Sequence, residues 1–403
     1  MPSRFAVRVV LGAALLLCGC GDRPPPHGNT GVPEAPVVEN TAPYEGEGAT
    51  WTVSRSPLLS IGGDDGEGSY TLTGVAGAVR LSDGRVVVAD KGSQVLHVFD
   101  ARGTHLRSIG REGGGPGEFR AVENVALLRG DSIAVWDPRL RRVSVFDHTG
   151  QLAHEVSPAG LGLFPRFIGV LGDGSFVLTA GLPAGGARSA STAARRDSVV
   201  YLRFGPSGGE ARDTIGRFPG PETVTLASSG AMTMEEVIFG RDVHLVVGGN
   251  RYFVADDDRY EVTEYRLPGA PVRRIRRAHV PSQVTNADLA SYREQPRDLS
   301  GVPPQLRAQF AKRNPDVPHR ATLPAFESLL LDEEGYLWVE HPRVTRATEG
   351  RWDVFDREGR WLTTVATPAG FQVRQIGGDF MLGTALDSLD VEHVHLYTLN
   401  RPR

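Results

Sequence analysis

The chain has 403 residues, enough for one large domain or two of ordinary size. Its formal net charge of −4 leaves no basic excess to neutralise a phosphate backbone, so the composition argues against nucleic-acid binding. With 49 glycines, 28 prolines and 40% hydrophobic residues, the chain is suited to a packed core built with many tight turns rather than long helices.

The first twenty residues carry an export signal. Arg4 and Arg8 precede an apolar stretch, VVLGAALLL, which is shorter than the ~20 residues that a membrane-spanning helix needs and fits the core of a signal peptide. The following Leu17-Cys18-Gly19-Cys20 resembles the lipobox of bacterial lipoproteins. The resemblance implies that residues 1–19 are removed and that Cys20 is lipidated, with palmitate among the acyl chains. The alternative is an ordinary signal peptide with an incidental cysteine.

The lipobox resemblance also implies a location. We expect the mature chain in the cell envelope, anchored to a membrane by its lipid and lying outside the cytoplasm. Position 21 is Gly rather than Asp. By resemblance to Gram-negative lipoproteins, this favours the outer membrane, with the protein facing the periplasm or the cell surface. The chain has 2 cysteines, at positions 18 and 20, so no disulfide is expected in the mature body.

A tether is predicted to follow the lipidated cysteine. Residues 21–50 are rich in proline, glycine, glutamate and threonine and have few bulky apolar side chains. Such a segment cannot bury enough surface to fold. We therefore expect residues 20–50 to be a disordered tether, able to reach on the order of 90 Å from the membrane at ~3.1 Å per residue.

A short motif then recurs along the chain. It reads VFDARG at residues 98–103, VFDHTG at 145–150 and VFDREG at 354–359, with RFGPSG at 203–208 as a looser copy. Six residues past the glycine of the three close copies stand Ile109, Val156 and Val365. Each copy reads as a strand that ends in an aromatic residue and a turn that closes on glycine, which indicates a repeat architecture.

A second hairpin precedes each copy. Its turns fall at Asp83-Gly84, Gly130-Asp131, Asp173-Gly174, Gly249-Asn250, Glu334-Gly335 and Gly377-Gly378. Four short antiparallel strands in about 40–50 residues make one blade of a β-propeller. Units begin near residues 75, 122, 166, 237, 324 and 372. We therefore predict an all-β fold, a six-bladed β-propeller over residues 51–403.

The sixth unit has only three strands of its own. The segment Trp51–Ile61 can supply the missing outer strand, which would close the ring and remove an exposed edge. The glycine-rich stretch GREGGGPGEF at residues 110–119 is predicted to connect the first two blades. A phosphate-binding loop is the alternative, but GxxxxGK[ST] is absent and a strand rather than a helix follows.

These residues resemble a known family. The run of residues 88–119, with VAD, VFDARG and the GPGEF connector, is similar to the NHL-repeat β-propellers. The match is close in the first two units and fair in the fifth. The resemblance implies the fold but hardly the function, because propellers serve as enzymes, adhesins and scaffolds alike.

Two insertions are expected on one face of the propeller. They are residues 181–198 and a helical stretch at 285–315, between blades four and five. Asn286 or Asp288 could cap the first helix of the second insertion, and Pro303-Pro304 could start another. The helical insertion is either a lid over the mouth of the central channel or a surface embellishment.

The same face is predicted to hold the ligand-binding site. Strand direction alternates, so the connectors and the loops between second and third strands gather around the channel mouth. We expect the ligand-binding residues there to be Glu123, Asn124, Asp137, Arg139, Glu340 and His341.

The sequence offers weaker signs of a metal. Asp256, Asp257 and Asp258 could supply oxygens to calcium, although neighbours on one loop cannot all point inward. The Glu123-Asn124 pair resembles the calcium-binding gluconolactonase-type propellers. His341 is the position most similar to the channel-mouth histidine that streptogramin lyases use with Mg²⁺. His393 and His395 share a strand face without a third ligand in view.

No nucleophile emerges from the sequence. It contains no GxSxG elbow, no cysteine in the mature body and no clear Ser-His-Asp set. We expect a monomeric binding or scaffold module for a protein, peptide or glycan, without a cofactor, although calcium or magnesium stays open. The alternative function is a metal-assisted lyase or lactonase. A third interpretation is a structural subunit of an outer-membrane assembly.

Overall fold

The structure is a computed structural model that describes residues 35–44, 50–63, 70–181, 191–228, 231–295 and 314–401. Residues 35–403 form one compact unit. The predicted signal peptide, the predicted lipidation site Cys20 and the predicted helix start at Pro303-Pro304 lie outside the described residues. Within the described ranges, no helix is both long and apolar enough to cross a membrane.

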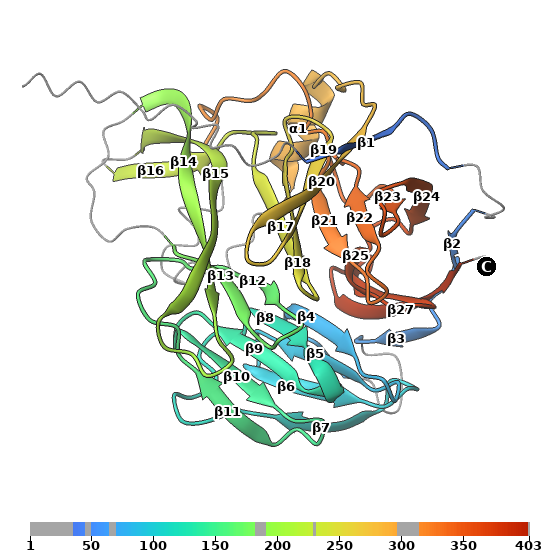
Figure 1. The fold of residues 1–403 in the computed structure, drawn as a ribbon. Coiled ribbons are helices and arrows are strands. Elements are labelled where there is room, and N and C mark those ends of the chain that lie inside the picture. The colour runs from blue at the N-terminus through green and yellow to red at the C-terminus, as the bar shows by residue number, and fades with distance from the viewer. Residues whose placement is uncertain are drawn as a thin grey trace, which may run out of the picture. The chain divides into compact units, whose positions relative to one another are not determined.

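Six sheets make up the unit (Figure 1), and we number them as blades along the chain. Blade one is β4 (Val75–Arg80), β5 (Val86–Asp90), β6 (Val95–Phe99) and β7 (His105–Ile109). Blade two is β8 (Asn124–Leu127), β9 (Ile133–Asp137), β10 (Arg142–Phe146) and β11 (Leu152–Val156). Blade three is β12 (Phe167–Val170), β13 (Phe176–Thr179), β14 (Ser191–Phe204), β15 (Ala211–Ser228) and β16 (Ala231–Glu236).

The remaining blades follow the same order from the inner to the outer strand. Blade four is β17 (Val243–Gly248), β18 (Arg251–Asp256), β19 (Glu261–Arg266) and β20 (Ala270–Arg277). Blade five is β21 (Ser328–Leu331), β22 (Leu337–Glu340), β23 (Gly350–Phe355) and β24 (Trp361–Thr367). Blade six is β25 (Gln372–Ile376), β26 (Phe380–Leu386) and β27 (Glu392–Asn400).

The blades form a closed ring. The inner strands β4, β8, β12, β17 and β21 contact one another in that order, and β25 of blade six contacts β4 of blade one. Blades five and six share one apolar cluster, to which Trp338 and Ile376 belong. The predicted all-β six-bladed propeller is confirmed, and the inner strands begin within a few residues of the predicted unit starts.

The first and last segments of the body meet in blade six. Strands β2 (Thr52–Val53) and β3 (Leu59–Ile61) both pair antiparallel with β27. The side chains of Leu59 and Ile61 are buried in a cluster with Val86 and Phe99 of blade one. The predicted closure of the last blade by Trp51–Ile61 is therefore confirmed.

The expected tether is wrong at its end. Residues 37–40 form β1 (Val37–Asn40), which pairs parallel with β20 and becomes the fifth strand of blade four. Figure 1 shows β1 in blue beside β20. Residues 21–34 and 45–49 lie outside the described residues, so for them the tether stays a prediction.

The recurring VFDxxG motif joins neighbouring blades. Its aspartate organises the turn, since Asp147 Oδ1 accepts hydrogen bonds from the backbone N–H groups of Thr149 (2.8 Å) and Gln151 (3.0 Å). Its glycine, Gly150, has a φ of +80°, and a Cβ there would lie 2.6 Å from Ile109 Cδ1 of blade one. Glycine is therefore required both by the backbone conformation and by the close approach.

The same contact recurs around the ring. A Cβ on Gly103 would lie 2.9 Å from Leu59, one on Gly208 2.9 Å from Val156, and one on Gly359 2.8 Å from Ile275. In the first two blades, the apolar residue six positions past each glycine is the surface on which the turn of the next blade packs. In blade six, which has no such residue of its own, β3 supplies Leu59.

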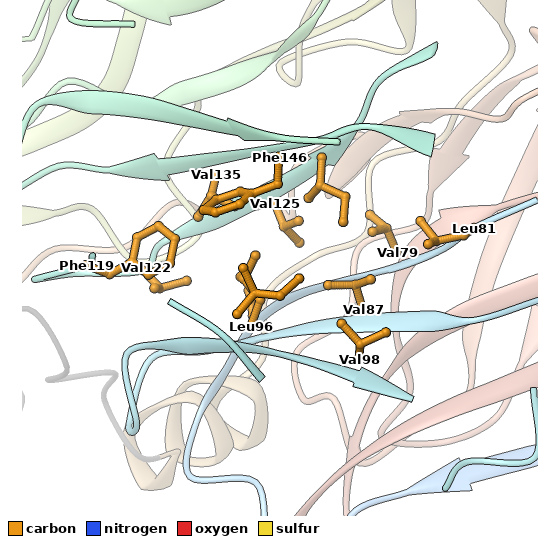
Figure 2. Packing of buried hydrophobic residues seen from close by; sticks show 13 residues of the cluster. Val79, Leu81, Val87, Leu96, Val98, Phe119, Val122, Val125, Val135 and Phe146 are labelled. Carbon is orange, nitrogen blue, oxygen red and sulfur yellow. The ribbon is translucent and has the colours of Figure 1, made fainter. Parts of the chain in front are cut away.

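Residues 110–119 connect blades one and two as predicted. Phe119 at the end of this stretch is fully buried between the two blades, and Figure 2 shows it beside Val122 and Phe146, facing Leu96 of β6. A Cβ on Gly110, whose φ is +81°, would lie 2.5 Å from the Phe119 ring. The connector is thus part of the core between the blades.

Both insertions differ in detail from the predictions. In the first, residues 191–198 belong to β14 rather than to a loop, while 182–190 lie outside the described residues. In the second, α1 (Asn286–Glu294) is capped by Thr285, whose side chain accepts a hydrogen bond from Asp288 N at 3.1 Å. In return, the Asp288 carboxylate accepts a hydrogen bond from Thr285 N, which completes a capping box. The helix does lie between blades four and five.

Candidate functional site

The predicted site residues fall into two groups, on blades two and five. In blade two, Asp137 is fully buried at the end of β9. One carboxylate oxygen accepts hydrogen bonds from Arg120 N (2.7 Å) and Ala121 N (3.1 Å), the other from Arg139 N and Leu140 N (both 2.9 Å). This carboxylate therefore fastens the connector to the following loop, and the Arg139 side chain is exposed beside it.

Glu123 and Asn124 lie at the start of the inner strand β8. The carboxyl group of Glu123 reaches solvent but is crowded by neighbouring blades, and this partial burial raises its pKa. Its charge interacts with Arg166 of blade three, with Asp137 and with Lys91 of blade one. Charged residues of three neighbouring blades thus act on this carboxyl group, and its place at the channel mouth stays a prediction.

Glu340 and His341 lie at the end of β22 in blade five. Glu340 is buried, and its Oε2 accepts a hydrogen bond from Ser328 Oγ at 2.7 Å while Oε1 pairs with Arg343. His341 is 26% exposed, and its Nε2 lies 2.9 Å from Asp353 Oδ2 on the neighbouring strand β23. Both carboxylate oxygens of Glu340 are therefore occupied by contacts within blade five, whereas His341 lines a space that a ligand can reach.

Asp353 is a residue that sequence reasoning missed. It is fully buried and accepts hydrogen bonds from Tyr260 Oη at 2.7 Å and Thr364 Oγ1 at 2.6 Å, and Arg277 Nε lies 3.2 Å away. Burial alone would raise the pKa of this carboxyl group, but the contacts from His341, Thr364 and Tyr260 outweigh it and lower the pKa. The carboxylate therefore stays ionised beside His341 Nε2, at ion-pair distance but without a hydrogen bond of good geometry.

Two groups near this carboxylate also have shifted pKa values. Burial, reinforced by the Asp353 charge, raises the pKa of Tyr260 well above its usual value, so the phenol stays protonated. Burial and the nearby Arg277 and His341 lower the pKa of His279. The sequence signal for this cluster is weak, since a single aspartate within the strand RWDVF marks it.

A pocket of about 550 Å³ opens beside His341. One wall is α1, and the other is the loop between β22 and β23. Its lining includes Asp288, Ser291, Leu323, His341, Arg343 and Arg351. Acidic, basic and hydroxyl groups are thus available around one cavity.

The α1 wall is fixed by a small core of its own. Leu289 of α1 packs with Val224 and Leu226 of β15 and with Ile238, which follows β16. An ion pair of 2.7 Å joins Arg320, which follows the insertion, to Glu222 of β15. The insertion therefore packs on the lengthened strands of blade three and also forms a pocket wall.

The candidate metal residues do not converge. Asp256 pairs with Arg196 (2.7 Å), Asp258 with Arg241 (3.0 Å), and Asp257 lies 3.3 Å from His244 Nε2. The rings of His393 and His395 are 5.6 Å apart. Within the part of the chain that the structure describes, no three His, Cys, Asp or Glu side chains form a group that could hold a metal ion.

Comparison with known proteins bears on the fold. A family model described as DUF5128, a 6-bladed beta-propeller, matches residues 69–159. The chain is a six-bladed β-propeller. The match supports no narrower statement, and the NHL-type resemblance of the sequence stays a prediction. No curated protein matches the sequence.

Solved structures of similar shape come from several bacteria. One is a protein described as exported, from Bacteroides fragilis, with 13% identity, a TM-score of 0.46, and coverage of 91% of this chain and 100% of that one. A DUF4221 member from Bacteroides vulgatus has 11% identity and a TM-score of 0.47, and the match covers 88% of this chain and 99% of that one. Virginiamycin B lyase from Staphylococcus aureus has 10% identity and a TM-score of 0.40, and the match covers 82% of this chain and 98% of that one. Identities and scores this low support no statement about activity.

Proposed function

We propose that this chain is a lipid-anchored, extracytoplasmic binding module that takes a protein, peptide or glycan into the pocket between α1 and the β22–β23 loop. The observation that carries the proposal is the pocket itself. One wall, α1, belongs to a segment inserted between two blades, and the other is the loop that joins two strands of blade five. Inserted segments and loops on a compact fold often carry function.

The chemistry of the lining fits a polar ligand. Asp288 and Ser291 face the cavity from the helix, and His341 and Arg351 face it from blade five. Because the capping box and the packing of Leu289 fix the helix, the wall is in place before a ligand arrives, which lowers the entropy lost on binding. The anchor rests on the Leu17–Cys20 motif, and the monomeric state stays a prediction.

A pocket-filling variant tests the proposal. Ser291→Trp places an indole in the cavity, whereas Ala290→Trp places one on the exposed side of the same helix. The full-length chain, purified in detergent, is applied to peptide and glycan arrays. We expect hits that weaken at least tenfold in Ser291→Trp and persist in Ala290→Trp. Arrays without hits, or hits that Ser291→Trp retains, would overturn the proposal.

A metal-assisted lyase or lactonase is the second candidate. The observation in its favour is His341, which lines the pocket and lies beside an ionised, buried carboxylate, an arrangement suited to taking up a proton. This candidate requires one divalent ion per chain, which elemental analysis of protein purified without chelators would detect. It also requires that His341→Gln loses the ion or the activity while Ala290→Trp keeps both.

A further inference from the structure

Blade one brings together three side chains that the sequence alone does not connect. Asp90 ends β5, His97 lies in the middle of β6, and Ser108 lies directly opposite His97 on β7. Ser108 Oγ is 2.8 Å from His97 Nδ1. On the other side of the ring, His97 Nε2 is 3.1 Å from Tyr70 Oη, 3.2 Å from Ser93 Oγ and 3.7 Å from Asp90 Oδ2.

Asp90 sets the direction of the hydrogen bonds. It is 1% exposed, and its carboxylate accepts hydrogen bonds from Gly92 N at 2.8 Å and Ser93 Oγ at 3.0 Å, among others. Burial would raise its pKa, but the nearby His97 and the hydrogen bonds from Gly92, Ser93 and Thr73 lower it to about 2. Asp90 is therefore an anion and only an acceptor at neutral pH.

The tautomer of His97 follows from this anion. Since Ser93 donates its proton to Asp90, Ser93 Oγ offers a lone pair to His97 Nε2–H, and the Tyr70 hydroxyl oxygen offers a second one. In the tautomer that satisfies these two acceptors, Nδ1 carries the lone pair and Ser108 donates its hydroxyl proton to it. The chain of hydrogen bonds runs in one direction, from Ser108 through His97 and Ser93 to Asp90.

The imidazole is enclosed while the hydroxyl is open. His97 is 2% exposed, with the Tyr70 ring 4.4 Å from it, and Tyr70 stacks on His105 at 4.6 Å. His105 Nε2 lies 3.2 Å from Ser108 Oγ. Ser108 itself is exposed on the outer strand of the blade. A fixed base below an accessible hydroxyl is the arrangement of an activated nucleophile.

We propose that Ser108 is a nucleophile toward carboxylic esters, with His97 as its general base and with Asp90 and Ser93 as positioning residues. Ser108 Oγ bonds to the carbonyl carbon of the ester while its proton moves to His97 Nδ1. The bond from carbon to the alkoxy oxygen breaks, and the alcohol leaves with that proton. Water, deprotonated by the same nitrogen, then attacks the acyl group and releases the carboxylic acid and free Ser108.

Blade six provides a control within the same molecule. His395 and Ser60 are opposite each other on β27 and β3, as His97 and Ser108 are on β6 and β7. In blade one, His97 pairs with Val88 of β5, and Asp90 lies two residues after Val88. In blade six, His395 pairs with Gly383 of β26, and the residue two positions after Gly383 is Ala385 rather than an aspartate. His395 Nδ1 instead lies 3.4 Å from Tyr397 Oη. Ser60 is exposed but lacks the anion, so we expect it to be unreactive.

Labelling with a fluorophosphonate probe tests the proposal. The full-length chain is incubated with the probe, and peptide mapping by mass spectrometry measures the adducts on Ser108 and on Ser60. We expect Ser108 to react at least tenfold faster than Ser60, His97→Gln to lower the Ser108 rate at least tenfold, and Ser108→Ala to abolish hydrolysis of p-nitrophenyl acetate above background. Ser93→Ala should lower the rate while its circular dichroism spectrum stays that of the wild type.

Equal labelling of Ser108 and Ser60 in the wild type would overturn the proposal, and this comparison needs no variant to fold. Undiminished labelling in a folded His97→Gln variant would overturn it as well. The pocket variant Ser291→Trp alters blade five and α1, so it should leave Ser108 labelling unchanged. The failure of one proposal is thus separate from the failure of the other.

Discussion

At the scale of single residues, glycines and aspartates turn a repeated sequence into a repeated contact. Each VFDxxG glycine lies against the outer strand of the previous blade, and each aspartate holds the turn that presents the glycine. In the two closest copies, the apolar residue six positions later receives the next turn. The motif therefore encodes the join between blades as well as the hairpin.

We predict that Gly150→Ala destabilises the protein by about 2–5 kcal/mol. A left-handed backbone costs a non-glycine residue about 1–2 kcal/mol, and overpacking costs about 1–3 more. Gly370→Ala is the control, because Gly370 has a φ of +76° but no atom within 4 Å of its Cβ position. Urea unfolding should show a clearly smaller loss for Gly370→Ala, and equal losses would contradict the close contact.

Asp90 makes stability depend on acid. Its pKa is lowered in the folded protein to about 2 from 3.8, so the unfolded chain takes up the proton first as pH falls. The stabilisation is complete above pH 4 and is lost as pH drops toward 2, and it amounts to about 2 kcal/mol. Unfolding of wild type and Asp90→Asn across pH 2–7 should show the two free energies converging at the acid end. A constant difference would contradict this assignment.

At the scale of elements, β1 joins two blades through one buried amide. Asn40 Nδ2 donates hydrogen bonds to Arg276 O of blade four (3.2 Å) and Gly359 O of blade five (3.1 Å). Its Oδ1 accepts one from Trp361 N at 2.8 Å. A four-residue strand thus satisfies backbone groups from both blades.

We expect Asn40→Ala to lower the free energy of unfolding by about 1–3 kcal/mol, because it leaves buried backbone groups without partners. Glu39→Ala, which removes only a surface ion pair with Arg276, should change stability little. Hydrogen exchange should show faster exchange of β1 and β20 amides in Asn40→Ala alone. Unchanged protection would mean that the amide does not hold the strand.

At the scale of the whole molecule, the ring is closed without a covalent bond. The body has no cysteine, and β2 and β3 complete the sheet of β27. Ile61 and Leu59 then bury their side chains against blade one. The same short segment thus fills the last blade and seals it to the first.

Ile61→Ala should cost about 2–4 kcal/mol, as large-to-small changes in a core do. Leu58→Ala is the matched control, since Leu58 lies three positions away on the same segment but is 71% exposed. Thermal unfolding should show a lower midpoint for Ile61→Ala and little change for Leu58→Ala. Similar midpoints for both variants would contradict closure by this segment.

The sequence predicts the propeller well because each turn is marked by a motif of a few adjacent residues. The Asp-Gly turns and VFDxxG copies define the blades, and the missing strand of blade six points to Trp51–Ile61. It does not predict β1, because VVEN lies in a proline-rich segment and its partner β20 is far along the chain. The T-x-x-D pattern of residues 285–288 is typical of a helix N-cap at Thr285, but the neighbouring Asn286 is also a residue type that commonly caps helices.

The candidate sites are harder to predict because they depend on strand register. His341 and Asp353 meet across β22 and β23, and His97 and Ser108 meet across β6 and β7 beside a bulge. A shift of one residue would turn each side chain to the other face of the sheet. Position along the strand predicts Asp137 and Glu340 as ligand-binding residues, but their carboxylates are occupied by contacts within their own blades.

The pairing of β1 with blade four also limits how far the folded body can lie from a lipid on Cys20. If Cys20 carries the proposed lipid, sixteen residues, 21–36, rather than thirty separate it from β1. At ~3.1 Å per residue this segment spans about 50 Å, little more than half of the tether expected from the sequence. Under the proposed lipid anchoring, a ligand of this protein must therefore come to the neighbourhood of the bilayer.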